Sequence, residues 1–262
     1  MPVFEILFPG VDGGKNKVAK IRGDSWMGAL KSGLAKLGDR TDVTSLMCDV
    51  KKQGMVVTDP KSGRVFRIRE VADPNAPALE ADSGMGRGKA PPARPVEEIL
   101  GDLFGKTQSI YDKGSLEEAA TFILGLASES IPAESGSVLI ADINDSDMYF
   151  AAASGPKAKE VMAFRVPMGQ GIAGFCAVEG VALAVSDVQQ DERFFADISD
   201  KLGYETSSLL CSPCQQDGRT YAVLELVNKE SNSSFTADEV NVLNFLAHEF
   251  ASYLINTGQT GD

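Results

Sequence analysis

The sequence is poor in histidine and cysteine and has no long apolar run. Its 262 residues include one His and four Cys. Four cysteines are too few for a disulfide scaffold in a chain of this length, so the expected compartment is the reducing cytoplasm. No uncharged apolar stretch approaches the roughly 20 residues that cross a bilayer, and the apolar run at 3–8 is too short for a signal peptide. The sequence therefore predicts a cytoplasmic protein that does not insert into membranes.

The residue sets that common enzymes use are also missing. The single histidine, His248, has no Ser and Asp partners at a recognisable spacing, and no carboxylate pair is placed for acid–base catalysis. Cys211 and Cys214 form a Cys-x-x-Cys motif, but no second pair completes a four-ligand zinc site. Buried structural cysteines are the favoured interpretation, and redox or metal chemistry is the alternative. The chain is therefore expected to be a non-enzyme without metal or cofactor.

What the sequence does have is a globular composition with an uneven charge. Hydrophobic residues make up 43% and charged residues 24% of the chain, and the net charge is -12, a composition typical of soluble globular proteins. Residues 1–72 hold 13 Lys and Arg against 8 Asp and Glu, whereas residues 96–262 hold 9 against 26. Opposite charges in the two halves indicate two domains with different interaction preferences, or an incidental surface composition.

Residues 1–72 predict a small basic α/β domain built from strands and one helix. Ser25 can cap the helix and Gly38 can end it. The expected elements are a strand at 3–8, the helix, and extended runs at 44–50, 55–58 and 64–71. Residues 73–95 contain five prolines, three glycines and no aromatic residue, which predicts a flexible linker.

The last extended run carries Arg64, Arg67 and Arg69, whose positive charges can bind an anionic partner. A solvated edge strand protected by its charges is the favoured alternative. Aromatic residues are sparse beside these arginines, which disfavours nucleic acid as the partner. A signalling protein is the expected partner of this domain.

The segment 96–262 alternates helical and strand-like patterns. Helices are expected from Val96 and, capped by Ser115, from Leu116, and a last helix from Thr236 to about Asn256. Strand-like runs lie at 137–143, 148–153, 163–166, 182–185, 207–211 and 221–227. The last helix is apolar on more than one side, so a second copy of the chain is the expected neighbour. We therefore expect a homodimer formed through the terminal helices.

Glycine-punctuated motifs within this segment resemble those of the GAF domain, a small-molecule-sensing module of signalling proteins and cyclic-nucleotide phosphodiesterases. The central one is Gly-Gln-Gly-Ile-Ala-Gly at 169–174. The matching stretches are 169–174, 180, 185–188, 191–194, 203–208, 209–213, 223–229 and 235–239. The resemblance covers about residues 110–256, whereas residues 1–72 resemble no family. The glycines permit close backbone approach, and the turn lacks the Lys-Ser/Thr of a phosphate-binding P-loop.

The resemblance implies an α/β (α+β) fold in which helices flank a six-stranded antiparallel sheet, with a ligand-sized cavity on one face. The candidate cavity residues are Phe150, Phe164, Cys176, Asp187, Phe194, Asp197, Thr206, Leu209 and Glu225. Arg165 and Arg193 flank these elements and would be the donors for a phosphate ligand.

A second implied feature is a structural motif made of Asn228, Lys229, Phe235, Asp238 and Glu239. In cyclic-nucleotide-binding relatives, a Lys–Asp salt bridge of this motif holds the pocket lid. The spacing between Phe235 and Asp238 is one residue shorter here, so cyclic-nucleotide binding is a less favoured alternative. The thiol-based free-methionine sulfoxide reductases are another, because Ala173 stands where their cysteine would lie.

The sequence therefore predicts a non-enzymatic bacterial signalling protein with output through protein partners. Its GAF domain senses a small molecule or serves as a dimerisation module. The alternative is a ligand-free GAF scaffold for protein docking.

Overall fold

The computed structural model describes residues 1–10, 15–41, 43, 46–51, 54–59, 62–71, 95–230 and 234–260. The chain forms two compact units, an N-terminal unit, Met1–Pro95, and a C-terminal unit, Val96–Asp262. Apart from Pro95, the predicted linker at 73–95 lies outside the described residues. Within the part of the chain that is described, no helix combines the length and apolarity needed to cross a membrane.

The N-terminal unit is an antiparallel sheet with one helix. Its elements are β1 (Val3–Phe8), β2 (Lys17–Arg22), α1 (Trp26–Leu37), β3 (Met47–Lys51), β4 (Gly54–Thr58) and β5 (Val65–Glu70), and the strands lie side by side in the order β2-β1-β5-β4-β3. Ser25 caps α1 by accepting from the Gly28 amide, and Gly38 ends it in a left-handed conformation. Both helix boundaries therefore follow the sequence prediction.

Strand β2 was not expected from the sequence. It pairs with β1 along its whole length, from Val3 opposite Arg22 to Phe8 opposite Lys17. Ile21 is its only buried side chain, so β2 is a polar edge strand. Such a strand has no apolar alternation to reveal it, because only pairing with its neighbour orders it.

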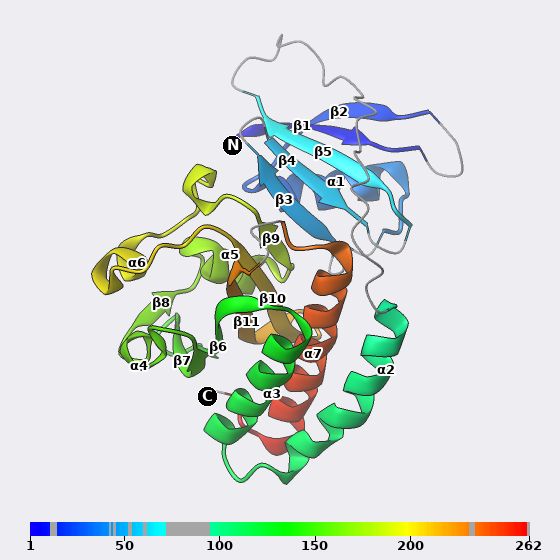
Figure 1. Cartoon of the computed structure of the whole chain (residues 1–262). Coiled ribbons are helices and arrows are strands. Elements are labelled where there is room, and N and C mark those ends of the chain that lie inside the picture. The colour runs from blue at the N-terminus through cyan, green and yellow to red at the C-terminus, as the bar shows by residue number, and fades with distance from the viewer. Residues whose placement is uncertain are drawn as a thin grey trace. The chain divides into compact units, whose positions relative to one another are not determined.

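The C-terminal unit consists of a curled antiparallel sheet between two groups of helices (Figure 1). Its elements are α2 (Val96–Thr107), η2 (Gln108–Asp112), α3 (Leu116–Ser130), β6 (Ala133–Asp142), β7 (Asp147–Ser154), α4 (Ala158–Val161), β8 (Arg165–Pro167), α5 (Gly171–Glu179), β9 (Leu183–Val185), η3 (Val188–Gln190), α6 (Asp197–Leu202), β10 (Leu209–Gln216), β11 (Arg219–Lys229) and α7 (Ala237–Thr257). The strands lie in the order β9-β10-β11-β6-β7-β8, and every neighbouring pair is antiparallel. The six-stranded antiparallel sheet predicted from the sequence is confirmed.

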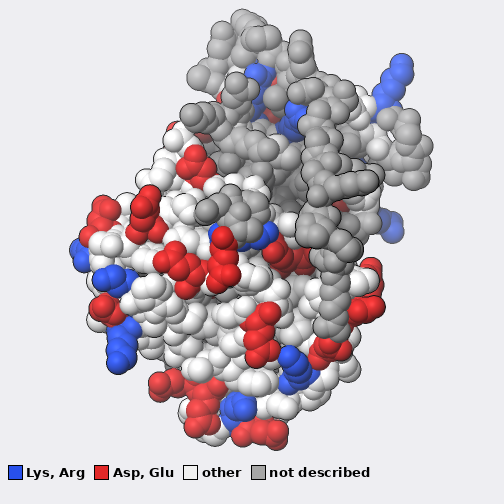
Figure 2. Space-filling model, viewed as in Figure 1, with Lys and Arg blue, Asp and Glu red and all other residues white. Residues whose placement is uncertain are grey.

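The long helices α3 and α7 pack against one face of this sheet and form the main hydrophobic core with it. Helix α7 packs on β10 and β11, and α3 packs on β6 and β7. Thr236 starts α7 with a capping box, accepting from the Glu239 amide while the Glu239 carboxylate accepts from the Thr236 amide. The shorter helices α4, α5 and α6 cover the other side (Figure 1). Figure 2 shows many more Asp and Glu than Lys and Arg side chains on the visible face of this unit.

The glycine turn before α5 depends on a close backbone approach. A Cβ on Gly174 would lie 2.6 Å from the Pro167 carbonyl oxygen and 3.0 Å from the Gly169 nitrogen, and the Gly169 amide donates to the Gly174 carbonyl oxygen at 3.0 Å. Both Gly169 and Gly171 have positive φ angles. The glycines are therefore needed for the backbone conformation of the turn. This agrees with the sequence, in which the turn lacks the Lys of a phosphate-binding P-loop.

Replacing Gly174 by alanine is expected to lower the unfolding free energy of the C-terminal unit by about 1–3 kcal/mol, because backbone atoms must move aside. Gly125 in α3 is the matched control, since nothing lies within 4 Å of its would-be Cβ. Gly125→Ala is expected to raise the unfolding free energy by about 0.5–1 kcal/mol. Urea unfolding of both variants measures the two effects, and equal midpoints would contradict this account.

Candidate functional site

A cavity of about 130 Å³ lies on the face of the C-terminal sheet that carries the short helices. Its wall is formed by β6, β7, β8, β10 and β11 together with α4, α5, α6 and the loops between them. Most lining side chains are apolar: Leu139, Phe150, Ala153, Val161, Val166, Ile172, Ala173, Phe194, Phe195, Ile198, Leu202, Leu209 and Val227 are among them. A few polar groups interrupt this surface, as in ligand pockets of other proteins.

The structure brings five of the nine sequence-predicted residues to the cavity wall. These are Phe150, Phe194, Thr206, Leu209 and Glu225. They come from four separate stretches of the chain, which the fold brings together.

The other four predicted residues are not among those that line the cavity. Asp187 is exposed, and Asp197 is also exposed and pairs with Lys201 at 3.6 Å. Phe164 is partly buried in the turn before β8. Cys176 is fully buried on α5, within electrostatic reach of Cys214 and Glu225. A residue can therefore lie on a helix or strand that borders the cavity while its side chain points away from the cavity.

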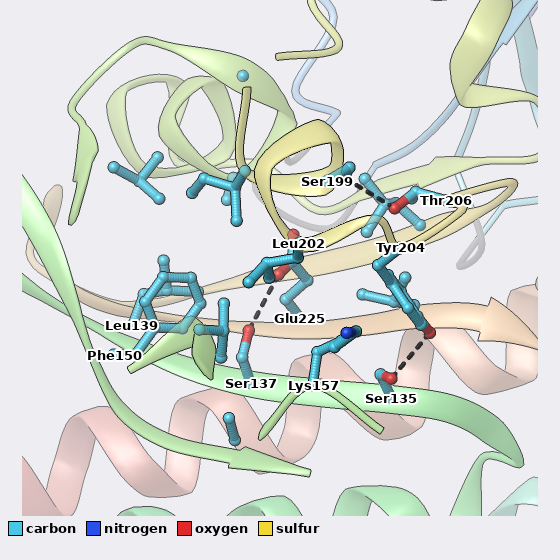
Figure 3. A pocket seen from close by; sticks show the side chains of 18 of the residues that line it. Ser135, Ser137, Leu139, Phe150, Lys157, Ser199, Leu202, Tyr204, Thr206 and Glu225 are labelled. Carbon is cyan, nitrogen blue, oxygen red and sulfur yellow. Dashed lines mark hydrogen bonds between the residues drawn. The ribbon is translucent and has the colours of Figure 1, made fainter. Parts of the chain in front are cut away.

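Several polar residues of the cavity were not predicted from the sequence. They are Ser135, Ser137, Ser154, Lys157, Gln170, Ser199 and Tyr204. The Tyr204 hydroxyl lies 2.8 Å from the Ser135 hydroxyl, and the Ser199 hydroxyl lies 3.0 Å from that of Thr206 (Figure 3). Strand alternation provides a signal for two of them, because Ser135 and Ser137 share the parity of Leu139 on β6. No comparable signal marks Tyr204, which follows a short helix.

Glu225 is the acidic group of the cavity. In the register of the sheet, it stands opposite Cys211 on one side and Ser137 on the other. Its carboxyl group accepts from the Ser137 hydroxyl at 2.9 Å and from the Cys211 thiol at 3.7 Å. Burial raises the pKa of Glu225, and these two hydrogen bonds oppose the rise. No Lys or Arg of the described residues forms an ion pair with it.

Glu225 is therefore expected to make stability fall with rising pH. Its raised pKa means that the folded state binds more protons than the unfolded state between the unfolded and the folded pKa. Over that window the unfolding free energy decreases as pH increases, by about 1.4 kcal/mol for each unit of pKa difference. Glu225→Gln is expected to remove this slope and to be at least as stable as the wild type at neutral pH. Urea unfolding across the pH range tests this, with the exposed Glu192→Gln as control; equal slopes in all three proteins would contradict it.

Asn228 fastens the segment that closes one side of the cavity. Its Oδ1 accepts from the Ser207 amide at 2.7 Å and from the Ser207 hydroxyl at 3.0 Å. Its Nδ2 donates to the Glu134 carboxylate at 2.9 Å and to the Glu205 carbonyl oxygen at 2.8 Å. The residue has a left-handed φ of 58°, which Asn tolerates better than most residues. One side chain thus ties the end of β11 to β6 and to the segment 204–208 that leads into β10.

The ion pair of this motif differs from the one implied by the family resemblance. Lys229 pairs with Glu239 at 2.6 Å and donates to the Ser234 carbonyl oxygen at 3.0 Å. Its ammonium group also lies 5.7 Å from the centre of the Phe235 ring. A Lys–Asp bridge to Asp238 is therefore not formed, because the capping box directs the Glu239 carboxylate toward Lys229. Since Phe235 is buried, the motif is a structural anchor at the start of α7.

The three cysteines of this unit are buried free thiols. Burial raises the pKa of Cys176, Cys211 and Cys214. Cys211 faces Glu225, whereas the neighbouring Ser212 donates to Asn244 of α7 at 2.6 Å on the other face of the sheet. Cys214 shares the strand parity of Ser212, and both Cys211 and Cys214 lie within electrostatic reach of Cys176 on α5. A thiolate nucleophile is disfavoured in this environment.

The two arginines considered as phosphate donors are engaged by carboxylates. Arg165 pairs with Asp142 at 2.6 Å and with Asp147 at 2.7 Å, and Arg193 pairs with Asp191 at 2.7 Å. Neither arginine is part of the cavity wall. The cavity therefore offers Lys157 as its cationic residue and is poorly suited to a phosphate.

A GAF domain family model matches residues 113–254. A dual cyclic-AMP and cyclic-GMP phosphodiesterase 11A of Takifugu rubripes is 42% identical over 81 residues, which are 30% of this chain and 9% of that protein. A probable 3',5'-cyclic phosphodiesterase of Caenorhabditis elegans is 29% identical over 150 residues, which are 52% of this chain and 20% of that protein. The chain thus spans a small part of these relatives.

Solved GAF structures share the fold at low identity. The GAF domain of a phosphoenolpyruvate-protein phosphotransferase from Coxiella burnetii has a TM-score of 0.57 and 21% identity, covering 64% of this chain and 99% of that one. A free methionine-R-sulfoxide reductase from Neisseria meningitidis, in complex with its substrate, has a TM-score of 0.51 and 19% identity, covering 63% and 90%. Proteins with different activities therefore share this architecture.

Proposed function

The chain belongs to the GAF family, and from that premise we propose that it is a non-enzymatic regulatory protein whose C-terminal unit senses a small molecule. The observation that carries this proposal is the cavity, with its mostly apolar wall and a few polar groups beside Glu225. Binding would favour one arrangement of the helices around the cavity, and protein partners would detect it. A ligand-free docking scaffold is the alternative.

The cavity volume favours a ligand smaller than a nucleotide. Drug-sized ligands occupy pockets of about 300–1,000 Å³, and an engineered cavity of about 150 Å³ takes up benzene. The cavity of about 130 Å³ is close in volume to the benzene-binding cavity and smaller than the pockets of drug-sized ligands. A cyclic nucleotide would require it to widen and would bring a phosphate to a wall without arginine, so cyclic nucleotides are not the proposed ligands.

Thermal unfolding in the presence of small metabolites and nucleotides tests the proposal. A ligand at one hundred times its Kd is expected to stabilise the protein by about 2.7 kcal/mol. Ala153→Phe, which fills the cavity from β7, is expected to abolish this effect, whereas Val178→Phe on the exposed side of α5 is expected to retain it. Stabilisation by no compound would refute the sensor and favour the scaffold.

We also propose that two copies of the chain pair through α2 and α7. Helix α2 packs on α7, yet its Phe104 is 60% exposed and the nearby Tyr111 is 46% exposed. A second copy that covers these aromatic side chains would remove apolar surface from water. Phe104→Asp is expected to convert a dimer into a monomer in sedimentation analysis, and an unchanged mass would contradict the proposal.

The N-terminal unit is proposed to contact a protein partner. Candidate anion-binding arginines of this unit are engaged within it, because Arg64 pairs with Asp39 at 2.7 Å and Arg69 pairs with Glu5 at 2.6 Å. This supports the prediction that nucleic acid is not the partner. The bacterial origin and the cytoplasmic location stay predictions from the sequence, since animal as well as bacterial proteins are similar to this chain.

A further inference from the structure

The ligand chemistry of the cavity can be derived from Glu225. Both oxygens of its carboxyl group accept hydrogen bonds, Oε2 from Ser137 and Oε1 from Cys211. In its ionised form this carboxylate has further lone pairs to offer to a donor. Among the described residues no cation pairs with it, although it lies in the cavity wall. A buried carboxylate without a countercharge is unfavourable.

The side chains around Glu225 indicate which apolar and polar groups a ligand of this cavity would carry. In Figure 3, Leu139 and Phe150 lie at one end of the cavity and Tyr204, Ser135 and Thr206 at the other, with Glu225 and Ser137 between them. A molecule that satisfies this wall has an apolar body next to a hydrogen-bond donor.

We infer that the cavity binds a small organic ammonium compound, whose ammonium group donates to Glu225 and whose apolar body lies against Leu139 and Phe150. This inference rests on the proposed sensor function and specifies its ligand. A ligand cation supplies the missing countercharge and forms charge-assisted hydrogen bonds, which are about twice as strong as neutral ones. An anionic group at the same place would meet the carboxylate and be repelled.

Two sources share this chemistry, simple amines and amino acids. Lys157 contributes an ammonium group to the wall, and in Figure 3 it lies on the same side of Glu225 as the Tyr204 hydroxyl. A carboxylate placed there would receive donors from both, so a zwitterion such as an aliphatic amino acid would use the whole cavity. A simple amine would use Glu225 alone. The size limit of about 130 Å³ excludes long polyamines from enclosure.

The experiment is calorimetric titration of the full chain with four compounds of one shape. Isoamylamine and leucine carry the ammonium group, whereas isoamyl alcohol and isovalerate do not. Both ammonium compounds are expected to bind, and Glu225→Gln is expected to weaken them at least about tenfold. Lys157→Met is expected to weaken leucine and to leave isoamylamine unchanged if amino acids are the source. If Lys157→Met changes the affinities for leucine and for isoamylamine by the same factor, simple amines are the favoured source.

The pH dependence keeps the inference testable if Glu225→Gln fails to fold. The affinity of the wild type for isoamylamine is expected to fall as pH is lowered through the pKa of Glu225, because protonation removes the acceptor charge. The other titratable groups facing it are Cys211 on β10, Cys176 on α5, and Lys157 and Tyr204 in the cavity wall. Glu225 is the carboxyl group among them, so it is the group whose negative charge protonation removes.

The outcomes separate the inference from the sensor proposal. Binding of isoamyl alcohol or isovalerate as tight as that of isoamylamine would overturn the ammonium assignment while leaving a sensor. Undiminished amine binding by a folded Glu225→Gln protein would overturn it as well. If none of the four compounds binds and no metabolite stabilises the chain, the sensor proposal itself fails.

Discussion

Replacing Phe250 by alanine is expected to lower the unfolding free energy of the C-terminal unit by about 3–5 kcal/mol. Phe250 lies on α7 with 0% of its surface exposed, and its ring stacks on that of Tyr253 with 6.1 Å between the centres. The substitution removes this buried ring and leaves a cavity that the packed helices cannot close. His248→Ala, two residues away on the exposed side of the same helix, is expected to change the unfolding free energy by less than about 0.5 kcal/mol.

Intrinsic fluorescence allows this loss to be assigned to one unit. The single tryptophan, Trp26, lies in the N-terminal unit, whereas the five tyrosines all lie in the C-terminal unit. Phe250→Ala is expected to move the tyrosine-detected unfolding transition to lower urea and to leave the tryptophan-detected transition in place. A shift of both transitions together would show that the two units unfold as one, and an unmoved tyrosine transition would contradict the assigned core position.

Replacing Asn228 by alanine is expected to lower the unfolding free energy by about 1–3 kcal/mol and to loosen the segment at 204–208. The substitution removes an amide whose two ends hold Ser207, Glu134 and Glu205, and each of these solvent-exposed hydrogen bonds contributes about 0.5–1.5 kcal/mol. Alanine also fits the left-handed φ of 58° less well than asparagine does. Urea unfolding measures the stability, and faster amide hydrogen exchange at 204–208 measures the loosening.

Asn228→Gly separates the two contributions. Glycine adopts positive φ without steric cost, so this variant loses the hydrogen bonds but keeps the backbone conformation. It is expected to be more stable than Asn228→Ala and less stable than the wild type. If Asn228→Gly matched the wild type in stability and in hydrogen exchange, the side-chain hydrogen bonds would not be what holds the segment.

The features that the sequence predicts correctly depend on contacts between residues close together in the chain. Ser115 caps α3 and Thr236 caps α7 as expected, because a capping hydrogen bond spans three residues of the same chain segment. Each apolar strand-like run in 96–262 corresponds to a strand, since the alternation of side chains is a property of the run itself. Edge strand β2 lacks that alternation, and it is the strand that the sequence did not indicate.

The sequence by itself determined the family fold of the C-terminal unit, its helix ends and the uneven charge that separates 1–72 from 96–262. Only the tertiary structure decided which side chains meet at the cavity. Glu225 accepts from Ser137, 88 residues away, and Lys229 pairs with Glu239 instead of Asp238. Such contacts depend on sheet register and on how each helix is rotated against the sheet, and these are set by the packing of the whole unit.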